Sequence, residues 1–287
     1  MEFKTILHAT DFSDASQRAL EQARKLAAYH GARLHVVHVQ ILFEARYPAL
    51  AVATLASQHE RSEQQLREWL ASKGGDVIMA KLEHARASVA IADYAESHDI
   101  DLIVVGSHGY SGIDGLLMGS EARRLVRLTH KPVLVVRSEA ETDATDVPYG
   151  HLLAPVDFSA ASLAALRQAD QLATRYGASL TALHSLDVLE PTHYAYVSSQ
   201  IQMPLARQAL DKFLAKADLA TKPEQIVSAA AAAASIVETA SSRGVDLVVI
   251  ARSGMGTLQR FLLGSTTERV LNSAVCDVLV LSGKKNA

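Results

Sequence analysis

The feature that most constrains the fold of this chain is an internal repeat. Residues 7–38 align without gaps on residues 153–184 at an offset of 146, so that the Asp-Phe-Ser at 11–13 recurs at 157–159. Farther along the chain, the match continues at an offset of 145. A register that holds over both ends of a domain-sized stretch is typical of a duplicated domain and not of chance similarity.

The length of the chain supports two domains of equal size. Its 287 residues give each copy enough sequence to bury a hydrophobic core. We predict one domain at 1–138 and a second at 149–287. The stretch between them, 139–148, is acidic and has no apolar periodicity, which is typical of a solvated linker.

Each copy alternates between strand and helix patterns, which predicts an α/β fold. In the first copy we expect strands at 5–9, 34–39, 77–82, 101–105 and 132–136, and helices at 13–29, 54–71, 88–97 and 121–128. Ser13 is suited to begin the first helix and Gly31 to end it. Strands such as 102–105 and 247–250 are apolar on both faces, as in a parallel sheet covered by helices on both sides. The alanine-rich run 228–235 favours helix and leaves the end of the third strand of the second copy undefined.

Composition excludes several classes of partner. The chain is 49% apolar and 21% charged with a formal net charge of −3, which offers no electrostatic attraction to nucleic acid or to an anionic membrane. No stretch approaches the length of a membrane span, and the N-terminal residues lack the apolar segment of a signal peptide. The single cysteine, Cys276, excludes an internal disulfide and fits a reducing compartment. We therefore expect a cytoplasmic protein.

Two features of each copy fall where ligands bind. In an open parallel sheet, ligands bind beyond the carboxyl ends of the strands. An aspartate follows the first strand in both copies, at Asp11 and Asp157. The fourth strand leads into a glycine-rich loop at 106–109, which is followed after nine residues by a Gly-Ser pair at 119–120 that recurs at 264–265.

The glycine loops point to an anionic ligand. Glycines let backbone N–H groups approach a phosphate closely and permit left-handed turns. The Gly-Ser pairs at 119–120 and 264–265 precede helices, whose unpaired N–H groups and positive dipole end favour an anion. The loop is neither a Walker loop nor a Rossmann fingerprint, because it has no Gly-Lys-Ser/Thr and does not follow the first strand. The alternative is that the glycines form tight turns only, and recurrence of the spacing weighs against it.

Together these residues resemble the universal stress protein family. The family pattern is an early aspartate, then a glycine, two residues, a glycine, nine residues and Gly-Ser, and the segments 9–13 and 106–109 match it closely. The resemblance covers nearly the whole chain, once per half, as in the tandem subclass. It implies two open parallel five-stranded sheets of order 3-2-1-4-5, flanked by helices and adenine nucleotide alpha hydrolase-like. It also implies that the last strands, 133–136 and 278–281, pair inside one chain as an intramolecular pseudo-dimer, with a homodimer as a further arrangement.

The resemblance further implies the ligand and its contacts. The ligand would be ATP, or ADP or AMP, with Mg²⁺ accompanying it. The early aspartates would face the adenine and ribose, Val39 and Ser185 would line the base pocket, and the glycines would surround the phosphates. In the first copy the nucleotide-binding residues would be Ala9, Thr10, Asp11, Val39, Val105, Gly106, His108, Gly109, Gly119 and Ser120. In the second copy they would be Pro155, Val156, Asp157, Ser185, Ile250, Ala251, Ser253, Gly254, Gly264, Ser265, Thr266 and Thr267.

The two copies depart from the pattern in different ways. Glu121 follows the Gly-Ser of the first copy, where it would repel phosphate and satisfy the N–H groups of its own helix. The second copy has Thr266 and Thr267 there, which suit a phosphate, but has Ala251 where the first glycine belongs. The methyl group of Ala251 still allows the backbone to approach a phosphate closely if the φ of this residue is negative. Our hypothesis is that the second site binds nucleotide more tightly.

Single polar residues near these loops have competing interpretations. His38 recurs as His184, and both are more typical of partly buried histidines with satisfied hydrogen bonds than of catalytic bases. A metal cluster with His8 and His35 is an alternative, but the second copy lacks both of these histidines. Arg252 is a candidate phosphate contact, weighed against a solvated surface arginine.

The sequence therefore predicts a regulatory, adenine-nucleotide-binding protein of the stress response without strong catalytic activity. One alternative is a nucleotide-free protein-interaction module, which Glu121 and Ala251 would favour. Another is an enzyme, either a slow ATPase or an ATP-dependent adenylating enzyme. No pair of base and nucleophile recurs in both halves, so we predict no catalytic residues and no metal ligands.

Overall fold

A computed structural model provides the fold and describes seven ranges of the chain. These are residues 1–41, 64–71, 77–107, 118–137, 147–186, 193–254 and 263–282, with the backbone alone for 193–201. His108 and Gly109, most of the expected linker and residues 54–63 of the expected second helix lie outside these ranges.

Both halves run through the same succession of elements. The first half contains β1 (Thr5–Thr10), α1 (Asp14–His30), β2 (Arg33–Ile41), β3 (Ile78–His84), α3 (Ala87–Ser97), β4 (Leu102–Gly106), α4 (Ser120–Leu128) and β5 (Val133–Val136). Residues 64–71 are also helical. The second half contains β6 (His151–Val156), α5 (Ala160–Tyr176), β7 (Ser179–Ser185), α6 (His193–Ala217), β8 (Glu224–Ser228), α7 (Ala232–Ser242), β9 (Leu247–Ala251), α8 (Ser265–Ser273) and β10 (Asp277–Leu281).

The alanine-rich run of the second half divides between three kinds of structure. Strand β8 ends at Ser228, a short turn follows, and α7 begins at Ala232. The hydroxyls of Ser228 and Ser235 lie 2.7 Å apart and tie the strand end to the first turn of the helix. The helix expected over the whole run therefore occupies only its second part.

The ten strands form one continuous sheet of order β3-β2-β1-β4-β5-β10-β9-β6-β7-β8. The predicted order 3-2-1-4-5 is confirmed in both halves, and within each half the strands are parallel. The two halves meet where β5 and β10 pair antiparallel, with Val135 opposite Val278. Because the strands of the two halves run in opposite directions, their carboxyl ends lie at opposite edges of the sheet.

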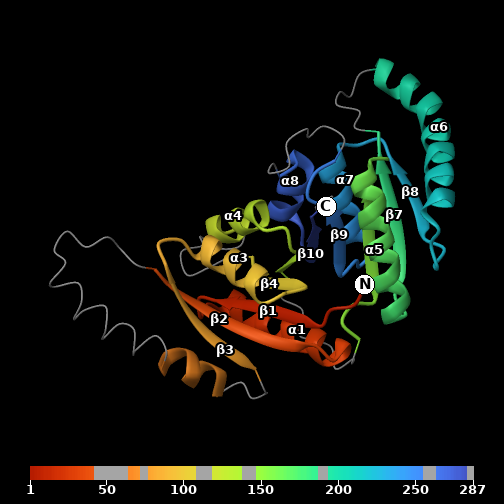
Figure 1. The fold of residues 1–287 in the computed structure, drawn as a ribbon. Coiled ribbons are helices and arrows are strands. Elements are labelled where there is room, and N and C mark those ends of the chain that lie inside the picture. The colour runs from red at the N-terminus through yellow and green to blue at the C-terminus, as the bar shows by residue number, and fades with distance from the viewer. Residues whose placement is uncertain are drawn as a thin grey trace.

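Helices cover both faces of the sheet, which gives three layers (Figure 1). Helices α1, α5 and α6 and the helical residues 64–71 pack on one face, around Leu20 and Leu166. Helices α3, α4, α7 and α8 pack on the other face, around Ile103 and Val248. No helix in the described ranges has the length and apolar content that a bilayer span requires.

The long helices α1 and α5 begin and end as the sequence predicts. The Ser13 hydroxyl accepts a hydrogen bond from Ser16 N, and Ser159 caps α5 in the same way. Each helix ends at a glycine in the left-handed conformation, Gly31 with φ 65° and Gly177 with φ 66°. The N-terminal N–H groups of these helices are therefore partly satisfied by the protein itself.

Side chains near the centre of the sheet link the two halves. Arg252 is buried, and its Nη1 donates to the carbonyl of Thr129, which ends α4, over 2.9 Å. The guanidinium of Arg127 on α4 lies 2.8 Å from the carboxylate of Glu268 on α8. The interpretation of Arg252 as a phosphate contact is wrong, because its guanidinium is turned toward the other half of the chain.

Candidate functional site

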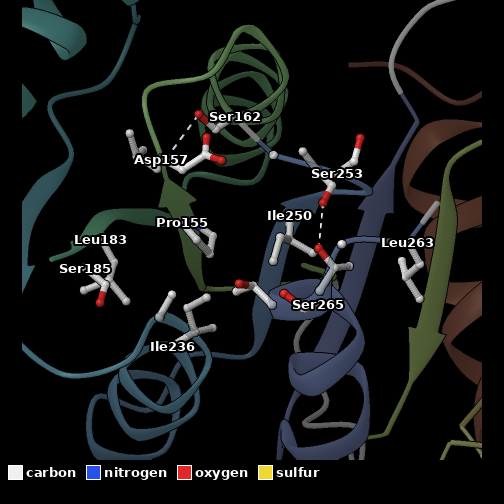
Figure 2. A pocket seen from close by; sticks show the side chains of 17 residues that line it. Pro155, Asp157, Ser162, Leu183, Ser185, Ile236, Ile250, Ser253, Leu263 and Ser265 are labelled. Carbon is white, nitrogen blue, oxygen red and sulfur yellow. Dashed lines mark hydrogen bonds between the residues drawn. The ribbon is translucent and has the colours of Figure 1, made fainter. Parts of the chain in front are cut away.

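A cavity of about 440 Å³ lies beyond the carboxyl ends of the strands of the second half. Its size falls within the roughly 300–1,000 Å³ of ligand pockets in proteins. It is lined by Pro155, Val156, Asp157, Ser162, Leu183, Ser185, Ala232, Ile236, Ile250, Ala251, Ser253, Gly254, Leu263, Gly264, Ser265, Thr266 and Thr267. Figure 2 shows how the strand ends and the starts of α7 and α8 surround it. Every residue predicted for the second copy lies in this lining.

A cavity of about 420 Å³ occupies the matching place in the first half. It is lined by Ala9, Thr10, Asp11, Ser16, His38, Val39, Ile41, Ala87, Ile91, Val105, Gly106, Gly119, Ser120, Glu121, Ala122 and Leu125. The residues predicted for the first copy are brought together here, apart from His108 and Gly109, which lie outside the described ranges. The two cavities open at opposite edges of the sheet, because each lies at the carboxyl ends of its own strands.

The aspartate of the second cavity is held by the turn that follows it. Oδ1 of Asp157 accepts hydrogen bonds from the Ser159 amide at 3.0 Å and from the Ser159 hydroxyl at 2.5 Å. Asp11 makes the same two contacts with Ser13, at 3.1 and 2.6 Å. In both halves the serine that caps the following helix therefore also orients the carboxylate at the cavity.

A phenylalanine in an unfavourable backbone conformation sits inside each of these turns. Phe12 has φ 67° and Phe158 has φ 64°, in the left-handed region that bulky residues rarely adopt. The ring of Phe158 lies 4.2 Å from that of His184, and the ring of Phe12 lies 4.5 Å from that of His38. Because such a conformation persists only where the surroundings enforce it, the phenylalanine and the histidine fix the shape of the turn.

The two histidines are held by backbone carbonyls. Nδ1 of His184 lies 2.8 Å from the Val156 carbonyl, and Nδ1 of His38 lies 2.9 Å from the Thr10 carbonyl. Since a carbonyl only accepts, Nδ1 carries the proton in both rings. Burial lowers the pKa of His38, because it disfavours the charged ring. Both histidines have the hydrogen-bonded, partly buried character that the sequence indicates.

Helix α8 begins at the second cavity without a side-chain cap. Its N-cap is Gly264, with φ −63° and ψ 144°, and glycine has no side chain to satisfy the first N–H groups. The amides of residues 265–267 have no partner within the helix, as at the start of any α-helix. The Thr267 hydroxyl donates to the Ala251 carbonyl over 2.9 Å, which leaves Ser265 and Thr266 as the hydroxyls nearest the helix start. This end of α8 offers donors and a positive dipole to an anion.

The glycines of the loops work through lack of bulk, not through left-handed turns. The described glycines with positive φ are Gly31, Gly177 and Gly244, none of which lines a cavity. A Cβ on Gly254 would lie 2.0 Å from Oδ2 of Asp157, so this glycine leaves room for the carboxylate. The described loop glycines therefore do not use the left-handed turns that glycine permits.

The first glycine of the pattern has a packing role in the first half. A Cβ on Gly106 would lie 2.8 Å from the backbone carbon and oxygen of Ala15, in the first turn of α1. The second half has Ala251 at this position, with a φ that is not positive and a methyl group in the cluster under α5. Ala251 therefore meets the condition that its φ is not positive. Its methyl group packs on one face of the sheet, and Ile236 and Ile250 pack on the other.

Glu121 in the first cavity makes a contact that the sequence does not reveal. Its Oε2 accepts a hydrogen bond of 2.8 Å from the amide of Ser88, in the first turn of α3. Arg124 lies 3.7 Å from the same carboxylate. The expectation that Glu121 satisfies N–H groups of its own helix is wrong, because its carboxylate instead accepts from an N–H group at the start of α3.

Some lining residues were not predicted. Most are apolar side chains that close the sides of the cavities, chiefly Ile91 on α3 and Ile236 on α7, together with Leu183 and Leu263. The equivalent serines Ser16 and Ser162 line the cavities as well. Ile91 and Ile236 occupy equivalent places in the repeat, so their recurrence was a signal that could have found them. No group of three side chains suited to a metal ion occurs within the described ranges, and His8, His35 and His38 each hydrogen-bond to a different partner.

The fold and the two cavities define an α/β protein built from two repeats, and known proteins share this design. The model of the universal stress protein family matches residues 2–137 and again 148–282. A universal stress protein of Mycolicibacterium smegmatis is 29% identical over 289 residues, which cover 96% of each chain. One of Thermus aquaticus is 36% identical over 136 residues, which cover 47% of this chain and 99% of that protein.

A solved structure supports the arrangement of both halves. A protein of Pseudomonas aeruginosa, described as functionally unknown, superposes with a TM-score of 0.69, covers 97% of this chain and 92% of its own, and is 21% identical. At that identity the likeness concerns the fold alone. With both halves matched by the family model, the chain belongs to the universal stress protein family and is of the tandem type.

Proposed function

We propose that the second cavity binds ATP, or ADP or AMP, and that the protein acts as a regulator of the stress response in the cytoplasm. The domains at 1–138 and 149–287 would each contribute one site. Asp157 and Ser185 would face the ribose and base, and the start of α8 would face the phosphates. The protein would hold the nucleotide without rapid turnover.

One observation carries this proposal: an uncapped helix start and an oriented carboxylate face the same cavity. Gly264 begins α8 without a side-chain cap, and Asp157 is fixed by Ser159 on the far side of the cavity. Donors at the helix start and an acceptor at the carboxylate suit a ligand with an anionic end and a hydroxylated end, as a nucleotide has. The described lining contains no lysine or arginine, so backbone N–H groups and hydroxyls would bind the phosphates, and Mg²⁺ would arrive with the nucleotide.

The pairing of β5 with β10 supports a second part of the proposal. This antiparallel contact joins the last strand of each half. We infer that the halves form an intramolecular pseudo-dimer, in which one chain supplies both partners of the contact. Association of two such chains into a homodimer would then use another surface.

Substitution of Gly264 tests the nucleotide site. A Cβ at this position meets the Arg252 carbonyl at 3.4 Å and the Ser253 Cα at 3.5 Å, which are ordinary contacts. Gly264→Ala should therefore keep ATP affinity within about threefold, whereas the branched side chain of Gly264→Val should reduce it by about tenfold or more, a loss of about 1.4 kcal/mol. Titration calorimetry with ATP measures both, and thermal unfolding verifies that both variants are folded.

The proposal fails if wild-type protein binds no ATP at millimolar concentration. It also fails if folded Gly264→Val binds ATP as tightly as Gly264→Ala does. The first result would favour a nucleotide-free interaction module, and the second would mean that ATP binds away from the start of α8.

A further inference from the structure

We propose that the first cavity binds an uncharged, ring-bearing ligand of nucleoside size, and that the Glu121 carboxylate, which links the two helix starts at this cavity, disfavours a ligand phosphate there. The inference deepens the proposed function and rests on it, because the second cavity serves as the nucleotide site for comparison. It assigns the two halves different ligands although they share one fold.

The two cavities have nearly the same size and the same framework. Their volumes are about 420 and 440 Å³, and both lie between the strand ends and two helix starts. Ile91 in the first cavity corresponds to Ile236 in the second, and Val105 corresponds to Ile250. A ring system that fits one cavity should therefore fit the other.

A carboxylate already links the two helix starts of the first cavity. The Glu121 carboxylate accepts the 2.8 Å hydrogen bond from Ser88 N, and the N-cap of α3, Arg86, gives that helix no side-chain cap. One carboxylate thus lies in the first turn of α4 and caps α3. In the second half Thr266 replaces Glu121, so the carboxylate of this link is missing, although Ala233, in the place of Ser88, keeps its backbone N–H group. The contact is therefore a property of the first cavity and not of the fold.

A second carboxylate adds to the negative charge of this cavity. Asp11 lines it, and its Oδ1 receives the amide and hydroxyl of Ser13. The described lining contains these two carboxylates and no lysine or arginine. A triphosphate would bring several further negative charges beside them, at distances where like charges repel appreciably. The first cavity therefore disfavours a polyphosphate more strongly than the second does.

The rest of the lining favours a neutral ligand over a cation. The charges of Glu121 and Asp11 are already directed at donors of the protein, so neither is positioned as an open counter-ion. The remaining surface is largely apolar, formed by Ala9, Val39, Ile41, Ile91, Val105 and Leu125. An apolar cavity with a few hydrogen-bonding groups at one end suits a flat heterocycle that carries hydroxyl groups. Adenosine is the probe that matches this description.

The chain contains its own reporter for the first cavity. Trp69 is its single tryptophan, and its ring lies 5.7 Å from that of Phe12, which directly follows Asp11. Ligands in the second cavity lie in the other half of the chain. The tryptophan emission of the full chain should therefore report occupancy of the first cavity. We expect a saturable change with adenosine, and a change with ATP only at concentrations about tenfold higher or more.

Two substitutions, one in each half, test the effect of the Glu121 charge. Glu121→Gln keeps an oxygen that can accept from Ser88 N but removes the charge, so the concentration of ATP that moves the Trp69 signal should fall about tenfold while that of adenosine stays within about threefold. The reverse exchange in the second half, Thr266→Glu, should remove the calorimetric ATP site and leave the adenosine response of Trp69 unchanged.

The outcomes are decisive in both directions. The inference is overturned if adenosine gives no saturable Trp69 response at millimolar concentration, if wild-type protein responds equally to ATP and adenosine, or if Glu121→Gln leaves their ratio unchanged. Failure of the proposed function would be seen elsewhere, as the absence of the calorimetric ATP site that depends on Gly264. Since one readout follows Trp69 and the other follows Gly264, the two failures are distinguishable.

Discussion

The two halves of this chain show which features of the fold are fixed and which are free to differ. Both have the same strand order, a serine that caps the first helix, and a left-handed phenylalanine against a histidine ring. They differ at the start of the last helix, where Glu121 corresponds to Thr266, and in the core, where His8 corresponds to Ala154. What recurs shapes the backbone around the cavity. What differs sets the charge inside it and the response of each half to acid.

The largest expected difference between the halves is in their stability toward acid. His8 is fully buried between the Val104 carbonyl, 3.1 Å from Nδ1, and the Ser16 hydroxyl, 3.3 Å from Nε2. Burial lowers its pKa from 6.5 to about 4, and the second half has Ala154 in its place. Above pH 6.5 the histidine is neutral in both the folded and the unfolded chain, so it adds no pH dependence. Between pH 6.5 and 4 only the unfolded chain binds the proton, which lowers the free energy of unfolding by up to about 3 kcal/mol.

The variant His8→Ala, which copies the second half, should flatten this decline. Urea unfolding at pH 7, 6 and 5 measures the slope of stability against pH, which is independent of the stability that the variant loses at pH 7 through the cavity it creates. Part of the slope should persist through His30, because burial also lowers its pKa to about 4. An unchanged slope in His8→Ala would mean that His8 does not cause the loss of stability in acid.

Much of the fold was predictable because the sequence contains two copies of the same pattern. Apolar strands such as 102–105 and the capping residues Ser13 and Gly31 are local signals, and a repeat lets one copy check the other. The contacts that join elements distant in sequence were not predictable. The Glu121 carboxylate reaches Ser88 and the Arg252 guanidinium reaches Thr129, and both depend on how helices pack in space. The sequence shows which side chains are charged, but it does not show which groups those side chains contact.

A second difference between the halves concerns the space under the first helix. In Gly106→Ala the new methyl group would meet the Ala15 backbone at 2.8 Å, so α1 would have to shift. We expect a loss of about 2 kcal/mol of stability, typical of overpacking. The matched exchange, Ala251→Gly, should cost no more than about 1 kcal/mol, the usual cost of glycine within a strand. Chemical denaturation of both variants compares them. Equal losses would mean that α1 and α5 lie at the same distance from their strands.

The smallest predicted effect isolates the aspartate of the second cavity. In Gly254→Ala the added Cβ would overlap Oδ2 of Asp157, 2.0 Å away, and the carboxylate can move aside because it is the end of a flexible side chain. Stability should therefore change little, while ATP affinity should fall by about tenfold, or about 1.4 kcal/mol, because the displaced carboxylate no longer faces the ribose. Calorimetry with ATP and thermal unfolding measure the two quantities on the same sample.

The variant Asp157→Asn serves as the control, since it keeps the side-chain volume and lacks the charge. If Gly254→Ala binds ATP as wild type does while Asp157→Asn does not, the carboxylate acts from a position other than the one it has beside Gly254. If both variants bind normally, the aspartate has no part in holding the ligand.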